Sequence, residues 1–128
     1  MNLFGLLDQA ADRFGDRGAV YCGERQLHTW SELRQRALRM ASTLGAPGTR
    51  IAVASENRPE IVELMFATWA AECVVVPINY KLHPREMVQI IDDALGGPRR
   101  EHELDDLGAV LARDGDAGAG RAERRRHP

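Results

Sequence analysis

The chain has 128 residues with a formal net charge of −2 at pH 7, and 44% of its residues are apolar. This apolar fraction excludes wholesale disorder, and the length fits one small domain or part of a larger one. No run approaches the roughly 18 apolar residues of a membrane span, and no export signal opens the chain. A near-neutral charge balance predicts no attraction to nucleic acid. We therefore expect a cytoplasmic protein with no membrane span and no nucleic-acid partner.

The strongest helix and strand patterns lie in the N-terminal part of the chain, together with all seven aromatic residues. An apolar face over residues 3–14 predicts a first helix, with Asn2 as its cap and Gly15 at its end. Two short runs, 19–22 and 26–29, flank a glycine and predict a hairpin.

Thr29 and Glu32 have the spacing of a capping box at the start of a second helix. In such a box the hydroxyl covers one free helix N–H and the carboxylate covers another. The helix is expected to stop at Gly45 and Pro47. Its predicted apolar face consists of Trp30, Leu33, Ala37, Met40, Ala41 and Leu44.

A strand–helix–strand unit is predicted next. Residues 51–55 are apolar without alternation, as in a strand covered on both faces, and residues 73–78 form a second unbroken run. Pro59 and Glu60 suit the first turn of the intervening helix, and the crossover is expected to be right-handed. The apolar side of this helix is predicted to carry Ile61, Leu64, Met65, Thr68 and Trp69, with Val62 and Phe66 beside them.

A last helix is predicted from His83-Pro84 through residue 94. The predicted class is α/β, with a partial parallel sheet and flanking helices, built from the βαβ unit plus the N-terminal helix and hairpin, and followed by a disordered C-terminal tail. Residues 1–95 are expected to form the ordered part of one domain, and residues 96–128 a low-order Gly/Arg-rich tail. So few strands leave an open apolar sheet edge, which makes self-association possible.

The tail is too poor in large apolar groups to offset its ordering entropy by burial. Residues 95–100 carry no strand signal. Only four residues there have helical spacing, which is compatible with one or two short amphipathic turns: Leu104, Leu107, Val110 and Leu111.

Two cysteines, Cys22 and Cys73, are too far apart for a redox or zinc motif and are expected to be reduced, partly buried thiols. Lys81 is the single lysine among 17 basic residues. The histidines have no ligand spacing. His28 is predicted to be a surface residue of the hairpin and His83 a helix-start residue, and no role is assigned to His102 or His127.

Four motifs, in this order, resemble the start of the AMP-forming acyl-CoA synthetases, a branch of the adenylate-forming ligases. They are Thr-Trp-Ser-Glu-Leu (29–33), Arg-Ile-Ala-Val (50–53), Glu-Asn-Arg-Pro-Glu (56–60) and Val-Val-Pro-Ile-Asn-Tyr-Lys-Leu-His-Pro (75–84). The resemblance implies that residues 1–95 are the N-terminal part of an AMP-binding domain. In that family, a carboxylate such as a fatty acid attacks ATP to form an acyl-adenylate, which coenzyme A then converts to a thioester.

The sequence departs from the family in its third helix and in its catalytic residues. Family members usually have Ala-Gly-Ala where this chain has Ala71-Glu72-Cys73, so a left-handed Glu72 would cost on the order of 1 kcal/mol. The family stabilises the charge on the phosphates with a Ser/Thr/Gly-rich loop that ends in lysine, with a magnesium ion, and with a second lysine from a mobile C-terminal domain. No such loop occurs here, no glycine lies near Lys81, and no lysine follows it. We therefore assign no catalytic, cofactor-binding or metal-binding residue.

Several weaker patterns are interpreted as having no catalytic or ligand-binding role. The tail glycines lack the strand and lysine of a phosphate loop, the tail aspartates fail the calcium-loop pattern, and the terminal arginines are expected to be solvated. The polar residues after the first parallel strand lie where α/β sheets place ligands, but helix capping and dipole matching are favoured. The tail glycines are Gly115, Gly118 and Gly120, the tail aspartates are Asp114 and Asp116, and the terminal arginines are Arg124, Arg125 and Arg126. The polar residues after the first parallel strand are Glu56, Asn57 and Glu60.

Three hypotheses follow. The chain is a truncated N-terminal fragment of an acyl-CoA ligase that is inactive alone, or a subunit that docks onto the missing remainder of a split ligase, or a non-catalytic α/β interaction module. ATP, Mg²⁺ and coenzyme A belong to the parent family, and no cofactor is expected for this chain alone. The sudden loss of aromatic residues after residue 95 also suggests a shifted reading frame, which the nucleotide sequence would test.

Overall fold

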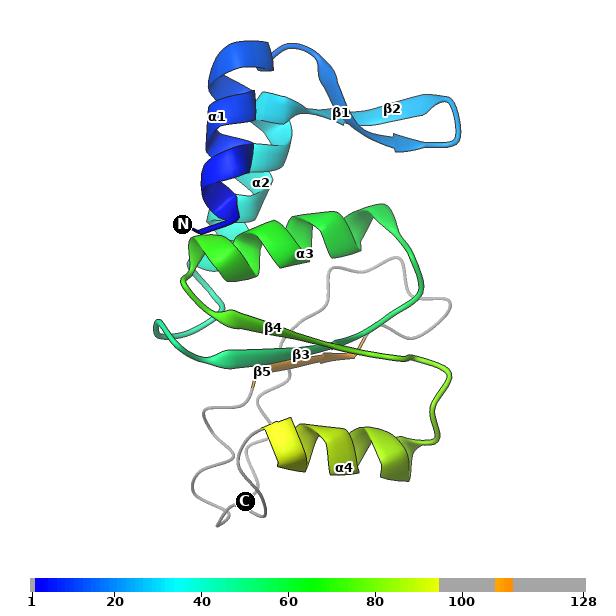
Figure 1. Ribbon diagram of the computed structural model, residues 1–128. Helices are drawn as coiled ribbons and strands as arrows, with labels where there is room; N and C mark the ends of the chain where they lie inside the picture. Colours follow the sequence, from blue (N-terminus) through cyan, green and yellow to red (C-terminus); the bar gives the residue numbers. More distant parts are fainter. Residues whose placement is uncertain (1, 95–107, 112–128) are drawn as a thin grey trace.

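The computed structural model describes residues 2–94 and 108–111. Helices cover both faces of a small parallel sheet, and a separate antiparallel hairpin extends from the N-terminal helices (Figure 1). The predicted α/β class is confirmed. In chain order the elements are α1 (Phe4–Phe14), β1 (Gly18–Cys22), β2 (Arg25–Thr29), α2 (Trp30–Ala41), β3 (Arg50–Ala54), α3 (Pro59–Ala70), β4 (Val74–Ile78), α4 (Pro84–Ala94) and β5 (Gly108–Leu111).

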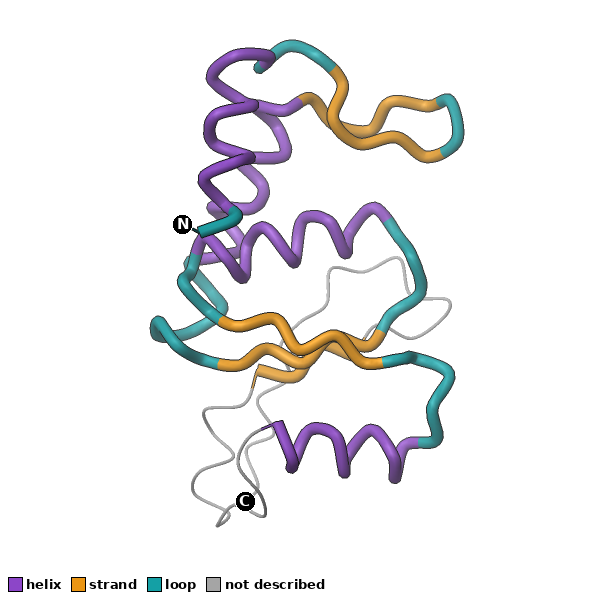
Figure 2. Tube along the Cα trace, viewed as in Figure 1, coloured by secondary structure: helices purple, strands orange, loops and turns teal. Residues whose placement is uncertain are grey.

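The parallel sheet has the strand order β4-β3-β5 (Figure 2). Residues Ile51 to Ala54 of the central strand are all buried, as their unbroken apolar pattern predicts. Helix α3 covers one face and α4 the other (Figure 1). This sandwich accounts for burial of the strand from both sides.

The β5 strand corrects the prediction of a helical turn in the tail. Val110 and Leu111 lie in a strand, where they pair in parallel with Val53 and Ala54 of β3. A short apolar run does not distinguish strand from helix by spacing, and the free edge of β3 selects the strand. The rest of the predicted tail, with Leu104 and Leu107, lies outside the described residues.

Strand β4 is an edge strand among the described elements, since it pairs only with β3 there. Val74 is 48% exposed, and within the strand only Ile78 is buried. Pro77 lacks an N–H, which an edge position tolerates. The predicted open apolar edge is therefore β4.

Helix α1 begins as predicted, with the Asn2 side chain accepting a hydrogen bond from the Phe4 N–H at 3.0 Å. The Asn2 amide also donates to the carbonyl of Trp69 at 2.5 Å, which joins the start of α1 to the end of α3. Gly15 ends α1 with right-handed backbone angles. Glycine is needed there for space, because a Cβ atom would lie 2.5 Å from Ser31 Oγ and 2.8 Å from the Ala11 carbonyl oxygen.

Thr29 caps α2 as predicted, and its hydroxyl oxygen accepts from the Glu32 N–H at 3.2 Å. The other half of the capping box differs, since the Glu32 carboxylate accepts from the Thr29 hydroxyl rather than from its backbone. The first helix N–H groups are covered by distant carbonyls, with Trp30 N donating to Arg17 O and Ser31 N to Gly15 O. The chain between α1 and β1 therefore covers the N–H groups of Trp30 and Ser31, which the Thr29 hydroxyl does not reach.

The buried face of α3 is rotated from the predicted one. Leu64 and Thr68 are buried as expected, but Glu63 and Ala67 are also buried, and Val62 is exposed. Ala67 belongs to the same apolar core as Leu7, Val20, Leu33 and Ala37, which fills the space between α1, α2, α3 and the hairpin. The pattern of apolar residues in the sequence did not predict burial on this side of α3. The burial depends on α2, which packs there and provides a partner for Glu63.

Helix α3 ends in a Schellman motif. The Glu72 N–H donates to the Trp69 carbonyl at 3.0 Å and the Cys73 N–H donates to the Thr68 carbonyl at 2.9 Å. Glu72 has φ 58°, the left-handed conformation that the comparison with Ala-Gly-Ala anticipates. Its carbonyl accepts from the Gly48 N–H at 2.9 Å, which ties the motif to the loop before β3.

Helix α4 starts at Pro84, directly after His83, as the His83-Pro84 pair predicts. The His83 N–H donates to the Glu86 carboxylate at 2.9 Å, and His83 Nδ1 accepts from the Arg85 N–H at 3.2 Å. Met87 and Ile91 of α4 pack against a buried cluster on the second face of the sheet. That cluster consists of Ala52, Ala54 and Ile78. No helix in residues 2–94 is long and apolar enough to cross a membrane.

Candidate functional site

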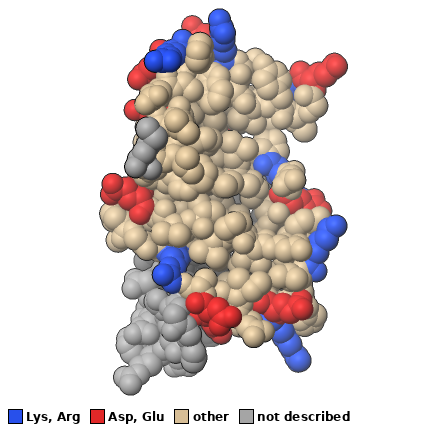
Figure 3. All heavy atoms as spheres, in the orientation of Figure 1, with Lys and Arg blue, Asp and Glu red and all other residues tan. Residues whose placement is uncertain are grey.

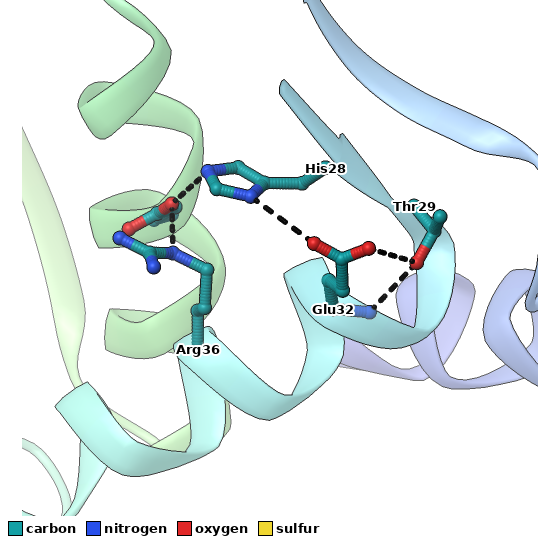
Figure 4. A network of polar contacts seen from close by, with 5 residues as sticks. His28, Thr29, Glu32 and Arg36 are labelled. Carbon is teal, nitrogen blue, oxygen red and sulfur yellow. Dashed lines mark hydrogen bonds and ion pairs between the residues drawn. The ribbon is translucent and has the colours of Figure 1, made fainter. Parts of the chain in front are cut away.

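The most elaborate polar arrangement in the described chain joins the hairpin to α2 and α3 (Figure 4). Its centre is Glu63 of α3, whose side chain is only 4% exposed. Glu63 Oε1 accepts from Arg36 Nε of α2 at 2.5 Å and lies 3.0 Å from His28 Nε2 of β2. Three elements far apart in the sequence therefore meet at one carboxylate oxygen.

Burial of Glu63 requires these partners, because an unpaired carboxylate in an apolar interior is strongly destabilised. The hydrogen bond to Glu63 is the main cause that raises the pKa of Arg36 above its usual value. Arg36 is itself 48% exposed, so its charge keeps contact with solvent. The Arg36–Glu63 pair thus gives the buried carboxylate a hydrogen-bond donor, while the charge of Arg36 remains partly exposed to solvent.

His28 is a correction to the sequence interpretation, which placed it on the hairpin surface. Its side chain is only 19% exposed, and its second nitrogen, Nδ1, lies 3.6 Å from Glu32 Oε2. The imidazole therefore lies between two carboxylates, with Thr29 fixing the Glu32 side chain (Figure 4). The available signal was Glu63, a charged residue four positions before Ala67 in the buried stripe of α3.

A second polar group follows the carboxyl end of β3, the edge where open α/β sheets bind ligands. The Glu56 and Arg58 side chains form an ion pair at 3.8 Å, and Glu60 lies in the first turn of α3 as dipole matching predicts. The capping role predicted at this turn is wrong for Asn57, since the cap residue is Arg58 and its side chain makes no capping hydrogen bond. This group is accounted for by local pairing.

The neighbouring end of β4 carries the single lysine. The Asn79 side chain accepts from the Lys81 N–H at 3.0 Å, which closes an Asx turn. Lys81 Nζ lies 5.8 Å from the centroid of the Tyr80 ring, a weak cation–π contact on an exposed turn. This geometry stabilises a turn and does not form the glycine-lined cradle that ATP phosphates require.

Metal-binding side chains are not grouped in the part of the chain that the structure describes. Within residues 2–94, no three His, Cys, Asp or Glu side chains are grouped so that they would hold a metal ion. The remaining sequence candidates, the tail glycines, aspartates and arginines together with His102 and His127, lie outside the described residues. We derive no catalytic step from the residues in hand.

Both cysteines are free thiols, but they differ in exposure. Cys73, the last residue of the Schellman motif, is buried, and burial raises its pKa above the usual thiol value. Cys22 is exposed at the end of β1, which corrects the expectation that both would be partly buried. Neither thiol lies in a metal-binding group of the described chain.

Charged side chains are scattered over the face of the described protein shown in Figure 3. Blue and red groups lie mainly at its margins, and a broad uncharged area covers the middle. No single-sign patch forms on this face.

Comparison with known proteins identifies the family. The AMP-binding enzyme family profile matches residues 7–95, which includes the hairpin, the βαβ unit and α4. The chain therefore belongs to the AMP-binding enzyme family.

Two relatives illustrate how the match is distributed. Probable acyl-activating enzyme 8 of Arabidopsis thaliana is 33% identical over 89 residues, which are 66% of this chain and 16% of the relative. The 4-hydroxybutyrate–CoA ligase 2 of Metallosphaera sedula is 34% identical over 91 residues, which are 68% of this chain and 16% of the relative. The chain thus spans only a small part of the length of the curated relatives that it matches.

Solved structures show the same partial correspondence. The N-terminal subdomain of Klebsiella oxytoca NpsA matches with a TM-score of 0.66 and 26% identity, over 75% of this chain and 26% of that one. A Mycobacterium tuberculosis fatty acyl CoA synthetase matches with a TM-score of 0.66 and 27% identity, over 72% of this chain and 19% of that one. The described fold is thus an N-terminal piece of an adenylate-forming domain.

Proposed function

We propose that this chain is a structural N-terminal segment of an AMP-forming acyl-CoA ligase, and that it does not form acyl-adenylates alone. The family match to residues 7–95 carries the proposal. It covers all of the ordered helices of the chain apart from the first residues of α1, but none of the described residues builds a phosphate-binding loop. The segment supplies packed layers on which the rest of a ligase domain would be completed.

The range of acids named for the relatives supports a scaffolding role. Those names include a short hydroxy acid and a steroid acid, 3-oxocholest-4-en-26-oate, for a ligase of Rhodococcus rhodochrous that is 29% identical over 73% of this chain. Similar segments therefore accompany different substrates. We propose a fatty acid as the substrate class of the complete enzyme. We also propose a cytoplasmic location, which the free thiols support.

An ATP–pyrophosphate exchange assay tests the proposal. The full 128-residue chain is incubated with ATP, Mg²⁺ and either dodecanoate or 4-hydroxybutyrate, with the full-length Metallosphaera ligase as the positive control. We expect no exchange above the enzyme-free background. Exchange by the purified chain, at a rate proportional to its concentration, would show that the phosphate chemistry is present and the proposal is wrong.

A docking subunit of a split ligase is the second candidate, and the open edge of β4 favours it. Val74 is 48% exposed beside that edge, and Val88 of α4 is 55% exposed. Co-expression with a downstream reading frame that encodes the phosphate loop is expected to restore exchange. Val74→Lys should abolish that restoration, whereas Val62→Lys on α3 serves as the matched exposed control.

A non-catalytic α/β interaction module is the remaining alternative. It requires the chain to unfold cooperatively as a monomer or dimer with a sharp thermal transition. Near-UV circular dichroism around Trp30 and Trp69 separates it from the other two, because both side chains are partly buried, Trp30 against the apolar core and Trp69 against Phe66. A chain without a sharp transition excludes the module.

A further inference from the structure

Helix α4 is the outermost described element on its side of the parallel sheet (Figure 1). Met87 and Ile91 pack toward the sheet, but no residue of α4 is fully buried. Val88 is 55% exposed and Ile90 is 37% exposed, and the helical repeat places them on opposite flanks of the stripe that faces the sheet. The described chain therefore leaves both apolar flanks of α4 uncovered.

The flank that carries Val88 has opposite charges at its two ends. Arg85 lies three positions before Val88 and Asp92 four positions after it, so the three side chains follow one line along the helix. This line is about 10 Å long, with Val88 close to its middle. Arg85 and Val88 are exposed and Asp92 is partly exposed. We call these three residues the Val88 flank.

Within one chain, the two charges of the Val88 flank are unfavourably placed. Arg85 lies in the first turn of α4, beside the positive end of the helix dipole, and Asp92 lies in the last turn, beside the negative end. No ion pair between described residues involves either side chain. An opposite charge brought by a partner to each end of the flank would offset both mismatches.

A second copy of the same helix brings those charges when the two helices are antiparallel. A two-fold axis near Val88 then places Arg85 of each copy beside Asp92 of the other, and the two Val88 side chains meet at the centre. A parallel pair would instead oppose like charges at both ends. The Val88 flank is therefore complementary to itself in one orientation only.

The opposite flank of α4 lacks this property. Ile90 lies between Glu86 and Asp93, which are both acidic, so an antiparallel pair of copies would oppose carboxylates at both ends. Glu86 also accepts a hydrogen bond from the His83 N–H in its own chain. Charge thus selects the Val88 side of α4 as the one that faces a second copy.

We propose that the Val88 flank of α4 is the contact between two copies of this chain, which associate with antiparallel α4 helices about a two-fold axis. One pair of 11-residue helices buries less surface than the roughly 1,200 Å² of a standard stable interface, so the dimer is weak. Because its ion pairs are exposed to solvent, salt weakens it further. This contact does not depend on whether the chain makes acyl-adenylates.

Sedimentation velocity on the full chain tests the proposal. The average mass is measured from about 10 μM to about 1 mM protein, at low ionic strength and in about 0.5 M salt. We expect the mass to rise with concentration from the 14.2 kDa of the monomer toward that of a dimer, and to rise less in high salt. A chain that stays monomeric over the whole range at low ionic strength would overturn the proposal.

Charge reversal tests the antiparallel arrangement. Arg85→Asp and Asp92→Arg each turn both attractive pairs of the symmetric contact into repulsive ones, so each should weaken self-association by about tenfold or more. Both substitutions improve the match to the helix dipole, so a loss of association would not reflect a loss of α4. The double variant restores both pairs with their signs exchanged and should associate like the unmodified chain.

Arg39→Asp is the matched control. Arg39 is exposed on α2, across the sheet from α4, and its reversal changes the net charge by the same amount as Arg85→Asp (Figure 1). It should leave self-association unchanged. Association that persists in both single α4 variants, a double variant that stays monomeric, or an equal loss in Arg39→Asp would each contradict this contact.

Discussion

The left-handed residue at the end of α3 allows a direct test of backbone strain in this fold. Glu72 occupies the C′ position of a Schellman motif at φ 58°, where a Cβ atom costs about 1–2 kcal/mol. Glycine removes that cost but also increases the entropy of the unfolded chain, by about 0.4–1 kcal/mol. We expect Glu72→Gly to raise the free energy of unfolding by about 0.5–1 kcal/mol, or the Tm by about 2–8 °C.

Charge must be separated from backbone strain at this site. Glu72 is exposed and lies beside the negative end of the α3 dipole, so removing its carboxylate alone is expected to add about 0.3 kcal/mol. Glu72→Gln isolates the charge, and Glu72→Ala removes the side chain but keeps Cβ. Urea unfolding of the full chain, followed by tryptophan fluorescence, measures all three.

The decisive comparison is glycine against alanine. Both variants lack the carboxylate, and they differ in the strain of the left-handed backbone and in unfolded-chain entropy. Glu72→Gly should be more stable than Glu72→Ala by at least about 0.5 kcal/mol. Equal stabilities would refute the strain argument and assign any gain to charge.

Further predictions concern packing, the buried carboxylate and the thiols. Gly15→Ala should lower stability by about 1–3 kcal/mol in urea unfolding, because its methyl group would meet atoms at 2.5 and 2.8 Å, whereas Gly5→Ala, with open space, should not destabilise. Glu63→Ala should cost about 1–3 kcal/mol, since it leaves Arg36 and His28 without their carboxylate partner, and a smaller loss would mean that the network contributes little. Iodoacetamide at pH 8 should label Cys22 rapidly and Cys73 only after unfolding, as mass spectrometry of the two peptides would show. Because burial raises the pKa of Cys73, its contribution to stability is complete below the usual thiol pKa and is lost as the pH rises toward the raised value, so Cys73→Ala should flatten the alkaline decline.

Local patterns in the sequence were sufficient for the family and for the helices and strands of residues 4–94. The run at residues 51–55 predicted a strand covered on both faces, and Pro59 marked the first turn of α3. These features depend on neighbours in the chain, whose spacing specifies strand or helix. The left-handed turn at Glu72 was also anticipated, because the family places glycine where this chain does not.

Contacts between segments that are distant in the sequence determined the features that local patterns did not predict. Nothing near Glu63 in the sequence indicates a buried carboxylate, since its partners come from residues 27 and 35 positions earlier, Arg36 and His28. Val110 and Leu111 are compatible with helix or strand until the free edge of β3 pairs with them. The spacing of side chains in the sequence indicates which residues share a face of a helix or strand. Only the tertiary structure determines which faces pack together, and the burial of a charge depends on that packing.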